Sequence, residues 1–468
     1  MRTRFLLFAA LPLAGVALAF AACSSSEPDV PVVERDAATL TQDAPSVLDV
    51  YVEDVIIPPV DAGPVPHCSP VDIEAGTGTK FCDLPGTDAP GLQVPAGFCI
   101  REFTTTPVTE TRVLRFAPNG DLFVAAPSMN TPGGASDGAG GILVLPDDDG
   151  DGRADSILTY AGPSPRMASV SCATLEGDVT NLACVHGLAF ANGYLYFTRS
   201  DEVRRVPYTA GDRVISGTPS ELVAKLGGAA LPDARWTHTL ELTKSGALYV
   251  SRGRYDSSGC SAEQMIRGSV FALHIEGAAT LPLTPELVSS GFRNPMYLRC
   301  SPASCGECYA SELSGDDWDG VGGREKIALL EKDSNWGYPC CVGPGMNAPG
   351  GAGVSCANVG RETTPIPLHD TPFGFDFDRG AFPAPYTHGL FSALHGVRTS
   401  FGGSGVVWIK ADPVSLRPTG AASAFVTGFG NPVGRATDAV FAPDGRLFIG
   451  DDTSGKIYWV APRTLAKP

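Results

Sequence analysis

The chain has 468 residues and a formal net charge of −17, with 34 lysines and arginines against 51 aspartates and glutamates. Acidity of this size, without a cluster of basic residues, argues against nucleic acid as a partner. The 55 glycines and 40 prolines exceed what a helical protein usually carries and favour a chain of strands and turns.

The N-terminus has the features of an export signal. Two early arginines precede an apolar run from Phe5 to Ala22, which is typical of a secretory signal rather than of a retained membrane span. Ala21-Ala22-Cys23 resembles the bacterial lipoprotein cleavage box, so we expect residues 1–22 to be removed and Cys23 to be lipidated. A plain signal peptide is the alternative. Ser24 favours the outer membrane of a Gram-negative cell, with the protein facing the periplasm or the surface.

Residues 23–66 are acidic and rich in proline, with little hydrophobic periodicity. Such a composition cannot build a core and predicts a disordered, flexible tether between the lipid and the folded part of the chain. The folded domain is then expected to span residues 67–468.

The cysteines also fit an oxidising compartment. Of the 13 cysteines, twelve remain once Cys23 is set aside, and an even number in an exported chain predicts disulfides. The pair Cys172 and Cys184, and the cluster Cys300, Cys305 and Cys308, are close enough in sequence for local bridges, although connectivity cannot be deduced from spacing. Half a zinc site at Cys305 and Cys308 is the alternative, but its second half is missing.

A hairpin pattern recurs along the folded domain. In each copy two alternating apolar runs flank a turn such as Asn-Gly or Asp-Gly, which is the strongest short-range hairpin signal. Clear copies span residues 113–127, 186–200, 238–253 and 437–452, and weaker copies span 295–313 and 372–396.

Six hairpin-bearing units predict an all-β fold, a six-bladed β-propeller of four-stranded blades. A β-sandwich or two smaller β domains are the alternatives. The final segment, residues 455–462, is expected to supply an outer strand that closes the ring beside residues 95–105.

An acidic loop lies between two apolar runs of the first unit. Asp147, Asp149 and Asp151 stand at positions 1, 3 and 5, with Gly152 at 6 and Asp155 at 9. This matches the front of an EF-hand-type loop, in which alternate carboxylates converge on one ion, although the glutamate of position 12 is missing. The pattern predicts a structural calcium site within one blade, with a solvated loop as the alternative.

Histidine and arginine recur near the ends of the inner strands, where a propeller places its ligands. A mouth rich in these side chains suits an anionic or quinonoid ligand that carries carboxylates. The residues at this level are His186, Arg235, His238, Arg293, His395 and Arg435.

GFRNPMYL (291–298) and EKIALLEKDSNWGYPCC (325–341) resemble the pyrroloquinoline quinone (PQQ)-dependent glucose/sorbosone dehydrogenases, which are six-bladed propellers. The sorbosone-dehydrogenase-like branch is most similar, and further motifs follow in the same order across residues 95–462. The resemblance implies that Arg293 and Asn294 contact PQQ and the reacting centre, and that Arg435 binds the carboxylates of the cofactor. It also implies calcium at Gly315-Asp316-Asp317.

In this family a histidine takes the proton of the substrate hydroxyl while hydride passes to the quinone, and calcium polarises the quinone. Here Arg235 stands where the family has that histidine, and arginine stays protonated, so it can contact a cofactor but cannot be the base. His238 can replace the histidine if a turn precedes its strand. His186 or His395 are the alternatives.

Three functions are therefore compared. The first is an exported, lipid-anchored oxidoreductase that oxidises a sugar or alcohol with PQQ. The second is a noncatalytic propeller that binds a saccharide or a protein partner. The third is a calcium-dependent, lactonase-like hydrolase, which needs a ring of Asn, Asp and Glu where this sequence has Arg and His.

Overall fold

A computed structural model of the chain describes residues 67–463, except 73–79, 86–87, 109, 128–139, 165–181, 183, 200–201, 216–219, 227–236, 255–259, 261–267, 278–279, 317, 319, 361–363, 397–403 and 431–433. The predicted signal, tether and lipidated Cys23 lie outside the described residues, as do Cys172 and Arg235. Within the described part, no helix has the length and hydrophobicity needed to cross a membrane.

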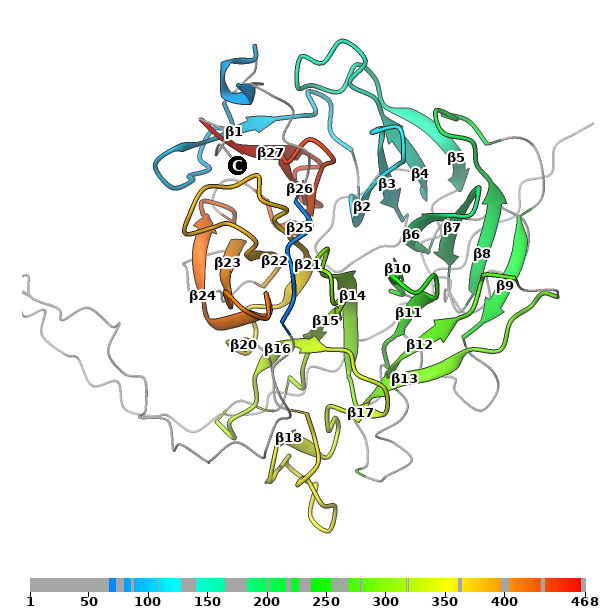
Figure 1. Ribbon diagram of the computed structural model, residues 1–468, viewed down its shortest axis with the longest axis vertical. Coiled ribbons are helices and arrows are strands. Elements are labelled where there is room, and N and C mark those ends of the chain that lie inside the picture. The colour runs from blue at the N-terminus through cyan, green and yellow to red at the C-terminus, as the bar shows by residue number, and fades with distance from the viewer. Residues whose placement is uncertain are drawn as a thin grey trace, which may run out of the picture. The chain divides into compact units, whose positions relative to one another are not determined.

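Six antiparallel sheets follow one another around a ring (Figure 1), which confirms the predicted propeller of four-stranded blades. Each blade is given from its inner to its outer strand. Blade 1 has β2 (Val113–Phe116), β3 (Leu122–Ala126), β4 (Gly140–Leu145) and β5 (Leu158–Ser164), and blade 2 has β6 (Val185–Ala191), β7 (Tyr194–Arg199), β8 (Glu202–Pro207) and β9 (Glu221–Lys225). Blade 3 has β10 (Leu240–Leu242), β11 (Leu248–Arg252), β12 (Ser269–Leu273) and β13 (Glu286–Ser290), and blade 4 has β14 (Asn294–Cys300), β15 (Cys308–Leu313), β16 (Glu325–Leu329) and β20 (Thr364–Ile366). Blade 5 has β21 (Pro372–Phe377), β22 (Leu390–Leu394), β23 (Gly405–Ala411) and β24 (Pro418–Val426), and blade 6 has β25 (Ala436–Phe441), β26 (Leu447–Asp451), β27 (Ile457–Pro462) and β1 (Phe98–Glu102).

Short elements decorate this ring. β17 (Ser334–Asn335) pairs in parallel with β13, and β18 (Cys341–Gly343) forms a small hairpin with β19 (Met346–Asn347). A single turn of 3-10 helix, η1 (Phe81–Asp83), precedes β1.

The ring closes through the first and last strands. β1 pairs antiparallel with β27, from Phe98 opposite Pro462 to Glu102 opposite Tyr458. The predicted pairing of residues 455–462 with residues 95–105 is confirmed, but β27 is the third strand of its blade and β1 is the outer one. With β1 as its fourth strand, the last blade is complete like the other five.

The residues at each inner hairpin turn adopt the backbone conformation that the turn requires. Asn192 and Gly193 both have positive φ, 51° and 75°, as a two-residue type I′ turn requires. At the other turns a single glycine takes the left-handed conformation, such as Gly120 and Gly445 at φ 94° and 91°. The same alternating apolar residues that flank these turns are buried between blades.

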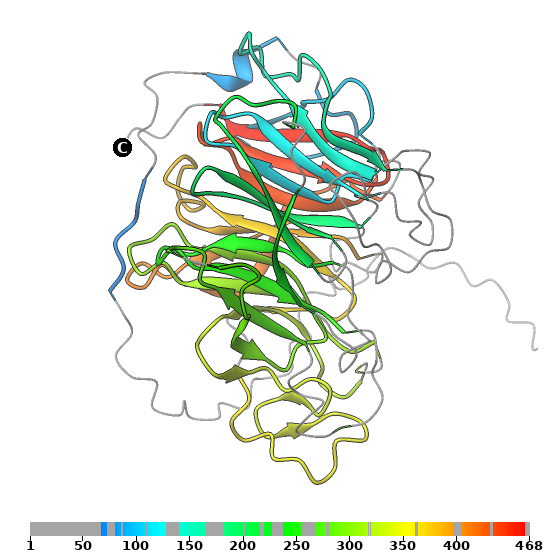
Figure 2. The same cartoon turned by 90° about the vertical axis from the view of Figure 1, so that its right-hand side faces the viewer.

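The axial channel of the propeller has two ends. The start face is the end at which the inner strands β2, β6, β10, β14, β21 and β25 begin, and the turn face is the end at which they run into their hairpin turns. Figure 2 shows the ring from its side, with the blades stacked between these two ends. Between the faces, ring contacts cross the channel: His186 meets Tyr297 at 5.5 Å, Tyr297 meets Phe373 at 5.9 Å, and Phe373 stacks on His395 at 4.2 Å between centroids.

Five disulfides are found among the described residues: Cys68–Cys305, Cys82–Cys99, Cys260–Cys340, Cys300–Cys308 and Cys341–Cys356. They confirm the disulfide interpretation over the zinc site. The expected local bridge is right for Cys300 and Cys308 but wrong for Cys305, which pairs with Cys68 across 237 residues because the chain ahead of β1 crosses to blade 4. Cys184 is also disulfide-bonded.

Candidate functional site

The predicted histidines and arginines that fall on described residues lie at the start face. His186 is the second residue of β6, His238 lies two residues ahead of β10, and Arg435 directly precedes β25. His395 directly follows β22, and the turn between a second and a third strand returns to this same face. Arg293 directly precedes β14. The structure therefore brings these residues to one mouth, as the repeat pattern predicts.

A buried charge network joins blades 5 and 6 to the start of blade 1. Arg112 Nη1 lies 2.9 Å from Asp452 Oδ2, and His395 Nε2 lies 3.0 Å from the same oxygen. Arg435 Nε donates to the carbonyl oxygen of His395 at 2.9 Å, and its backbone N–H donates to Asp451. Two guanidinium groups therefore lie around one carboxylate.

The protonation states in this network follow from burial. Burial lowers the pKa of His395 to about 4 in spite of Asp452, so the imidazole is neutral and donates its Nε2 proton. Burial opposes ionisation of Asp452, but His395 and Arg112 together lower the pKa of that carboxyl to about 2. Burial also lowers the pKa of Arg435, with Arg112 acting in the same direction. Asp452 is therefore an ionised carboxylate close to two guanidinium groups, and Asp451 is a second carboxylate near Arg435.

His238 is held as a neutral imidazole with one defined tautomer. Its Nδ1 lies 2.9 Å from the carbonyl oxygen of Ser251, an acceptor, so Nδ1 carries the proton. Burial and then the charge of Arg252 lower the pKa of His238 to about 3. Nε2 keeps its lone pair and is buried without a hydrogen-bond partner among the described residues. Residues 237–239 precede β10 without regular secondary structure, and the residues directly ahead of them lie outside the described part of the chain.

His186 is also held by a hydrogen bond at Nδ1, but its ring packs against other side chains inside the channel. Thr239 Oγ1 donates to the carbonyl oxygen of Met296 at 2.7 Å, so it can only accept from His186 Nδ1 at 3.3 Å. Burial, followed by the charge of Arg112, lowers the pKa of His186 to about 3. Its ring also packs edge-on against Tyr297. We therefore assign His186 to the floor of the mouth and keep His238 as the first candidate base.

Glu312 positions the Arg293–Asn294 pair. Its carboxylate accepts the backbone N–H of Arg293 at 2.7 Å and that of Asn294 at 3.2 Å. The Arg293 guanidinium donates to the carbonyl oxygen of Ser314 at 3.0 Å and pairs with Asp316. Burial raises the pKa of Glu312 to about 7. Asp316, which the resemblance places near calcium, is thus engaged by Arg293, and Asp317 lies outside the described residues.

Blades 3 and 4 meet at this pair. Thr237 Oγ1 lies 3.4 Å from Asn294 Oδ1, so the residue next to His238 contacts the residue next to Arg293. Arg254, which follows β11, donates its backbone N–H to the carbonyl oxygen of Arg293 at 2.8 Å. The candidate base, the Arg–Asn pair and a further buried arginine are therefore neighbours on the start face.

The acidic loop lies elsewhere, on the turn face between β4 and β5, as predicted. Oxygens of Asp147, Asp149 and Asp151 lie within 4.8 Å of one another, an arrangement that can hold a metal ion. The fourth predicted ligand is not in this group, because Asp155 Oδ2 accepts the backbone N–H of Asp148 at 2.6 Å. The indole Nε1 of Trp459 donates to the carbonyl oxygen of Gly152 at 2.7 Å, so the loop packs on blade 6.

We expect calcium to stabilise the fold through this loop. Addition of calcium after chelation should raise the melting temperature by several degrees, since a ligand at about 100 times its Kd adds about 2.7 kcal/mol of stability. Asp149→Ala should abolish the shift, whereas the matched variant Asp155→Ala should keep most of it. Differential scanning calorimetry of the three proteins with calcium and with EDTA checks this. An equal loss of the shift in both variants would contradict the three-ligand geometry.

Three site residues were missed by the sequence reasoning: Arg112, Asp452 and Glu312. Arg112 directly precedes the first inner strand, at the level where the other units carry their histidines and arginines, so that register could have revealed it. Asp452 follows β26, and only ring closure brings it to Arg112. Glu312 lies in β15, and its role depends on the pairing of β15 with β14.

No protein-family profile and no curated protein matches the sequence. The structure does resemble solved ones. One is the calcium structure of a Trichoderma reesei protein of Carbohydrate-Active Enzymes family AA12, with a TM-score of 0.62 and 20% identity, covering 81% of this chain and 99% of that one.

Two further structures share the architecture. The PQQ domain of a pyranose dehydrogenase from Coprinopsis cinerea, in its holo form, gives a TM-score of 0.58 at 16% identity and covers 80% of this chain and 98% of that one. The soluble aldose sugar dehydrogenase of Escherichia coli, in its apo form, gives a TM-score of 0.53 at 14% identity, covering 78% and 99%. This chain therefore has the propeller fold found in sugar dehydrogenases, at sequence identities that establish the fold alone.

Proposed function

We propose that this chain is an exported, lipid-anchored oxidoreductase that oxidises a hydroxyl group of a sugar or alcohol, with PQQ held at the start face. The observation that carries the proposal is His238: a buried, neutral histidine whose Nδ1 proton is committed to Ser251 and whose Nε2 has no partner among the described residues. The lone pair on Nε2 is the position at which the proton of a substrate hydroxyl would be accepted. The PQQ domain and the sugar dehydrogenase named above share the fold and support the same reaction class.

The start face fits a cofactor that carries carboxylates. Arg112 pairs with Asp452, and Arg435 lies close enough to Asp451 and Asp452 for both carboxylates to act on its charge. Guanidinium groups bind carboxylates through paired N–H donors. When bound, PQQ would supply an acceptor for hydride. Calcium, which the resemblance also implies, belongs to the same proposal, with Asp316 as the described acidic residue beside Arg293.

Different residues of the start face would bind the cofactor, orient the ligand and accept the proton. Arg112 and Arg435 bind the anionic groups, and Arg293 with Asn294 orients the ligand, held in place by Glu312. His238 takes the hydroxyl proton on Nε2, while the hydrogen bond from Nδ1 to Ser251 keeps the ring from turning over. The aromatic contacts of Tyr297 and Phe373 beneath the mouth limit water entry from the channel.

A second candidate function is a noncatalytic propeller that binds a saccharide or a protein at the same face. Arg235 favours it, because this arginine stands where the similar dehydrogenases have their base. The two candidates share the binding face and differ in whether turnover occurs.

Export and anchoring are part of the proposal. The five disulfides support an oxidising compartment, since cytosolic proteins rarely keep such bridges. The sequence around Cys23 adds the lipid anchor, with the outer membrane and a periplasmic or surface-facing domain as the expected location.

The test is reconstitution of the purified full chain with PQQ and calcium. We expect PQQ to bind with a Kd at or below micromolar, and Arg435→Gln to weaken binding on the order of tenfold, because one charge-assisted contact contributes about 1.5–3 kcal/mol. Arg463→Gln, an exposed arginine beyond β27, serves as the control of equal charge. A dye-linked screen of aldoses and alcohols then measures turnover. Absence of PQQ binding contradicts the proposal, and binding without turnover favours the second candidate.

A further inference from the structure

A second cavity opens at the turn face of the axial channel. Its volume is about 300 Å³, which is at the lower end of the range for small-molecule pockets. Residues from the inner strands of all six blades line it, among them Arg115, Glu241, Arg299 and Asp376, and Arg379 follows β21 in the hairpin turn. The start face uses the first residues of these strands and this cavity uses the last ones, so the two sites lie at opposite ends of the channel.

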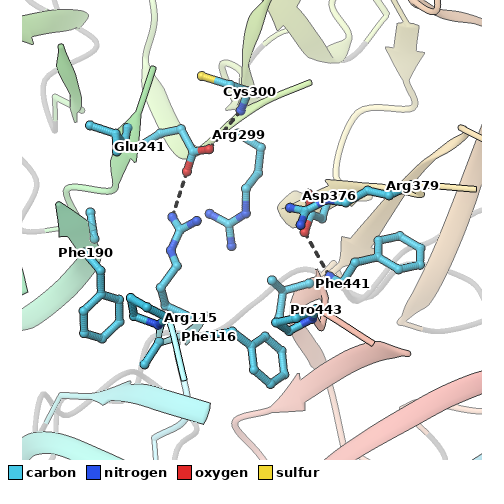
Figure 3. A pocket seen from close by; sticks show the side chains of 15 residues that line it. Arg115, Phe116, Phe190, Glu241, Arg299, Cys300, Asp376, Arg379, Phe441 and Pro443 are labelled. Carbon is cyan, nitrogen blue, oxygen red and sulfur yellow. Dashed lines mark hydrogen bonds and ion pairs between the residues drawn. The ribbon is translucent and has the colours of Figure 1, made fainter. Parts of the chain in front are cut away.

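Two arginines face each other across this cavity. Figure 3 shows the guanidinium groups of Arg115 and Arg299 pointing toward one another, from blades 1 and 4. Burial lowers the pKa of Arg115, and the charge of Arg299 acts in the same direction. Two cations at such close quarters repel each other, and an anion between them relieves the repulsion.

The neighbouring carboxylates already have hydrogen-bond partners. Glu241 accepts from Arg115 and from the backbone N–H of Cys300 at 3.1 Å. Asp376 accepts two backbone N–H groups, those of Phe377 at 2.8 Å and Phe441 at 2.9 Å. Asp438, behind Arg299, accepts the backbone N–H groups of Leu114 and Ala439 in addition to Arg299. Their negative charge partly offsets the positive charge of Arg115 and Arg299.

Some arginine N–H donors beside the cavity, in contrast, have no hydrogen-bond partner among the described residues. Arg299 is almost fully buried, and its Nε has no hydrogen-bond partner among the described residues. Arg379 Nε is likewise buried without a partner, and the guanidinium of Arg379 makes no hydrogen bond or ion pair within the described part of the chain. A buried donor without a partner costs about 1–3 kcal/mol, so these groups would gain from an acceptor in the cavity.

The remaining wall is apolar. Phe116, Phe190 and Phe441 line the cavity together with Pro118 and Pro443. The rings of Phe116 and Phe190 already pack edge-on against Phe448 and Phe123, so they are fixed in place and present preformed surface to a ligand. Apolar area removed from water contributes about 25 cal/mol per Å².

We propose that the turn-face cavity binds a small carboxylate with an apolar body, such as a short aromatic or aliphatic acid. Its carboxylate lies between Arg115 and Arg299 and takes up the unused Nε donor of Arg299, and Arg379 adds a third positive charge. The apolar body contacts the phenylalanine and proline wall. This site is separate from the start face and does not depend on the function proposed for that face.

Benzoate and its neutral analogue benzamide are suitable probes, measured by isothermal titration calorimetry on the full chain. We expect benzoate to bind with a Kd below about 1 mM and benzamide to bind at least tenfold more weakly, because only benzoate offers a charged acceptor. Arg379→Gln should weaken benzoate binding on the order of tenfold. Arg379 is partly exposed and makes no hydrogen bond to the described residues, so this variant should fold normally. Arg463→Gln is the control of equal charge and should bind as the wild type does.

A second variant tests whether removing a competing negative charge strengthens benzoate binding. Glu241→Gln keeps an acceptor for Cys300 but removes the charge that competes for Arg115, so benzoate should bind more tightly. Equal affinity for benzoate and benzamide, or an unchanged Kd in both variants, would overturn the proposal. PQQ binding should be the same in Arg379→Gln as in the wild type, which separates failure of this site from failure of the start face.

Discussion

Replacing His238 by glutamine is expected to lower kcat/KM of the reconstituted enzyme by about 10²- to 10⁴-fold, the usual contribution of a general base. Glutamine can still donate to the carbonyl oxygen of Ser251, so the local fold is kept, but it offers no basic nitrogen in the place of Nε2. PQQ affinity should change little. The matched control is His274→Gln, which replaces an exposed histidine of the same blade and should leave the rate unchanged.

The pH dependence offers an independent measurement. The pKa of His238 in the folded protein is lowered to about 3, so Nε2 stays unprotonated well below neutral pH. We therefore expect no acidic limb near pH 6.5 in the profile of kcat/KM. The lowered pKa also stabilises the fold above pH 6.5, and this contribution is lost as the pH falls toward 3. His238→Gln should weaken that loss. A normal rate in the variant would remove His238 as the base.

Replacing Asp438 by alanine is expected to destabilise the propeller by about 3–5 kcal/mol, the range measured when one partner of a buried ion pair is removed. Asp438 is fully buried in β25, and its carboxylate accepts from Arg299 of blade 4 and from the backbone N–H of Leu114 in blade 1. One side chain of blade 6 thus joins two other blades around the channel. Its loss leaves a buried cation and a buried N–H without an acceptor.

Two companion variants separate charge from shape. Asp438→Asn keeps an oxygen for Leu114 and should cost less than Asp438→Ala. Combining Arg299→Met with Asp438→Ala should recover part of the loss, because no unpaired charge then remains in the channel. Urea denaturation monitored by tryptophan fluorescence gives the free energies of unfolding. If the double variant is as unstable as the sum of the single variants, the ion pair is not the cause.

The architecture was predictable because each blade carries its own local signal. Asn192-Gly193 and Asp444-Gly445 mark hairpin turns whose flanking residues alternate in polarity, and these signals depend on a few neighbouring residues only. Ring closure followed from the leftover strand at residues 455–462. The bridge between Cys68 and Cys305 was not predictable, because it joins residues that only the completed ring brings together.

The sequence predicted at which end of the channel the candidate residues lie, but not which of them contact one another. The register placed His186, His238 and Arg435 at one face, since each stands near the same end of an inner strand. It did not reveal that Asp452 joins Arg112 to His395, because these residues come from three different blades. The tautomer of His238 likewise depends on the carbonyl of Ser251 in the neighbouring strand. The turn-face cavity was missed because its arginines lie inside apolar strands and look like isolated polar residues in the sequence.

The segment that leads into the propeller also determines how the protein can be attached to other objects. Residues 67–72 lie beside the hairpin turn of blade 4, tied there by Cys68–Cys305 and by the hydrogen bond from Ser304 to Ser69 (Figure 2). β27 ends opposite the beginning of β1, so the described chain leaves the ring at the turn face as well. A fusion partner, an affinity tag or an electrode linker joined directly at residue 67 or residue 463 would therefore be attached at the turn face, at the opposite end of the channel from the histidine and arginine mouth.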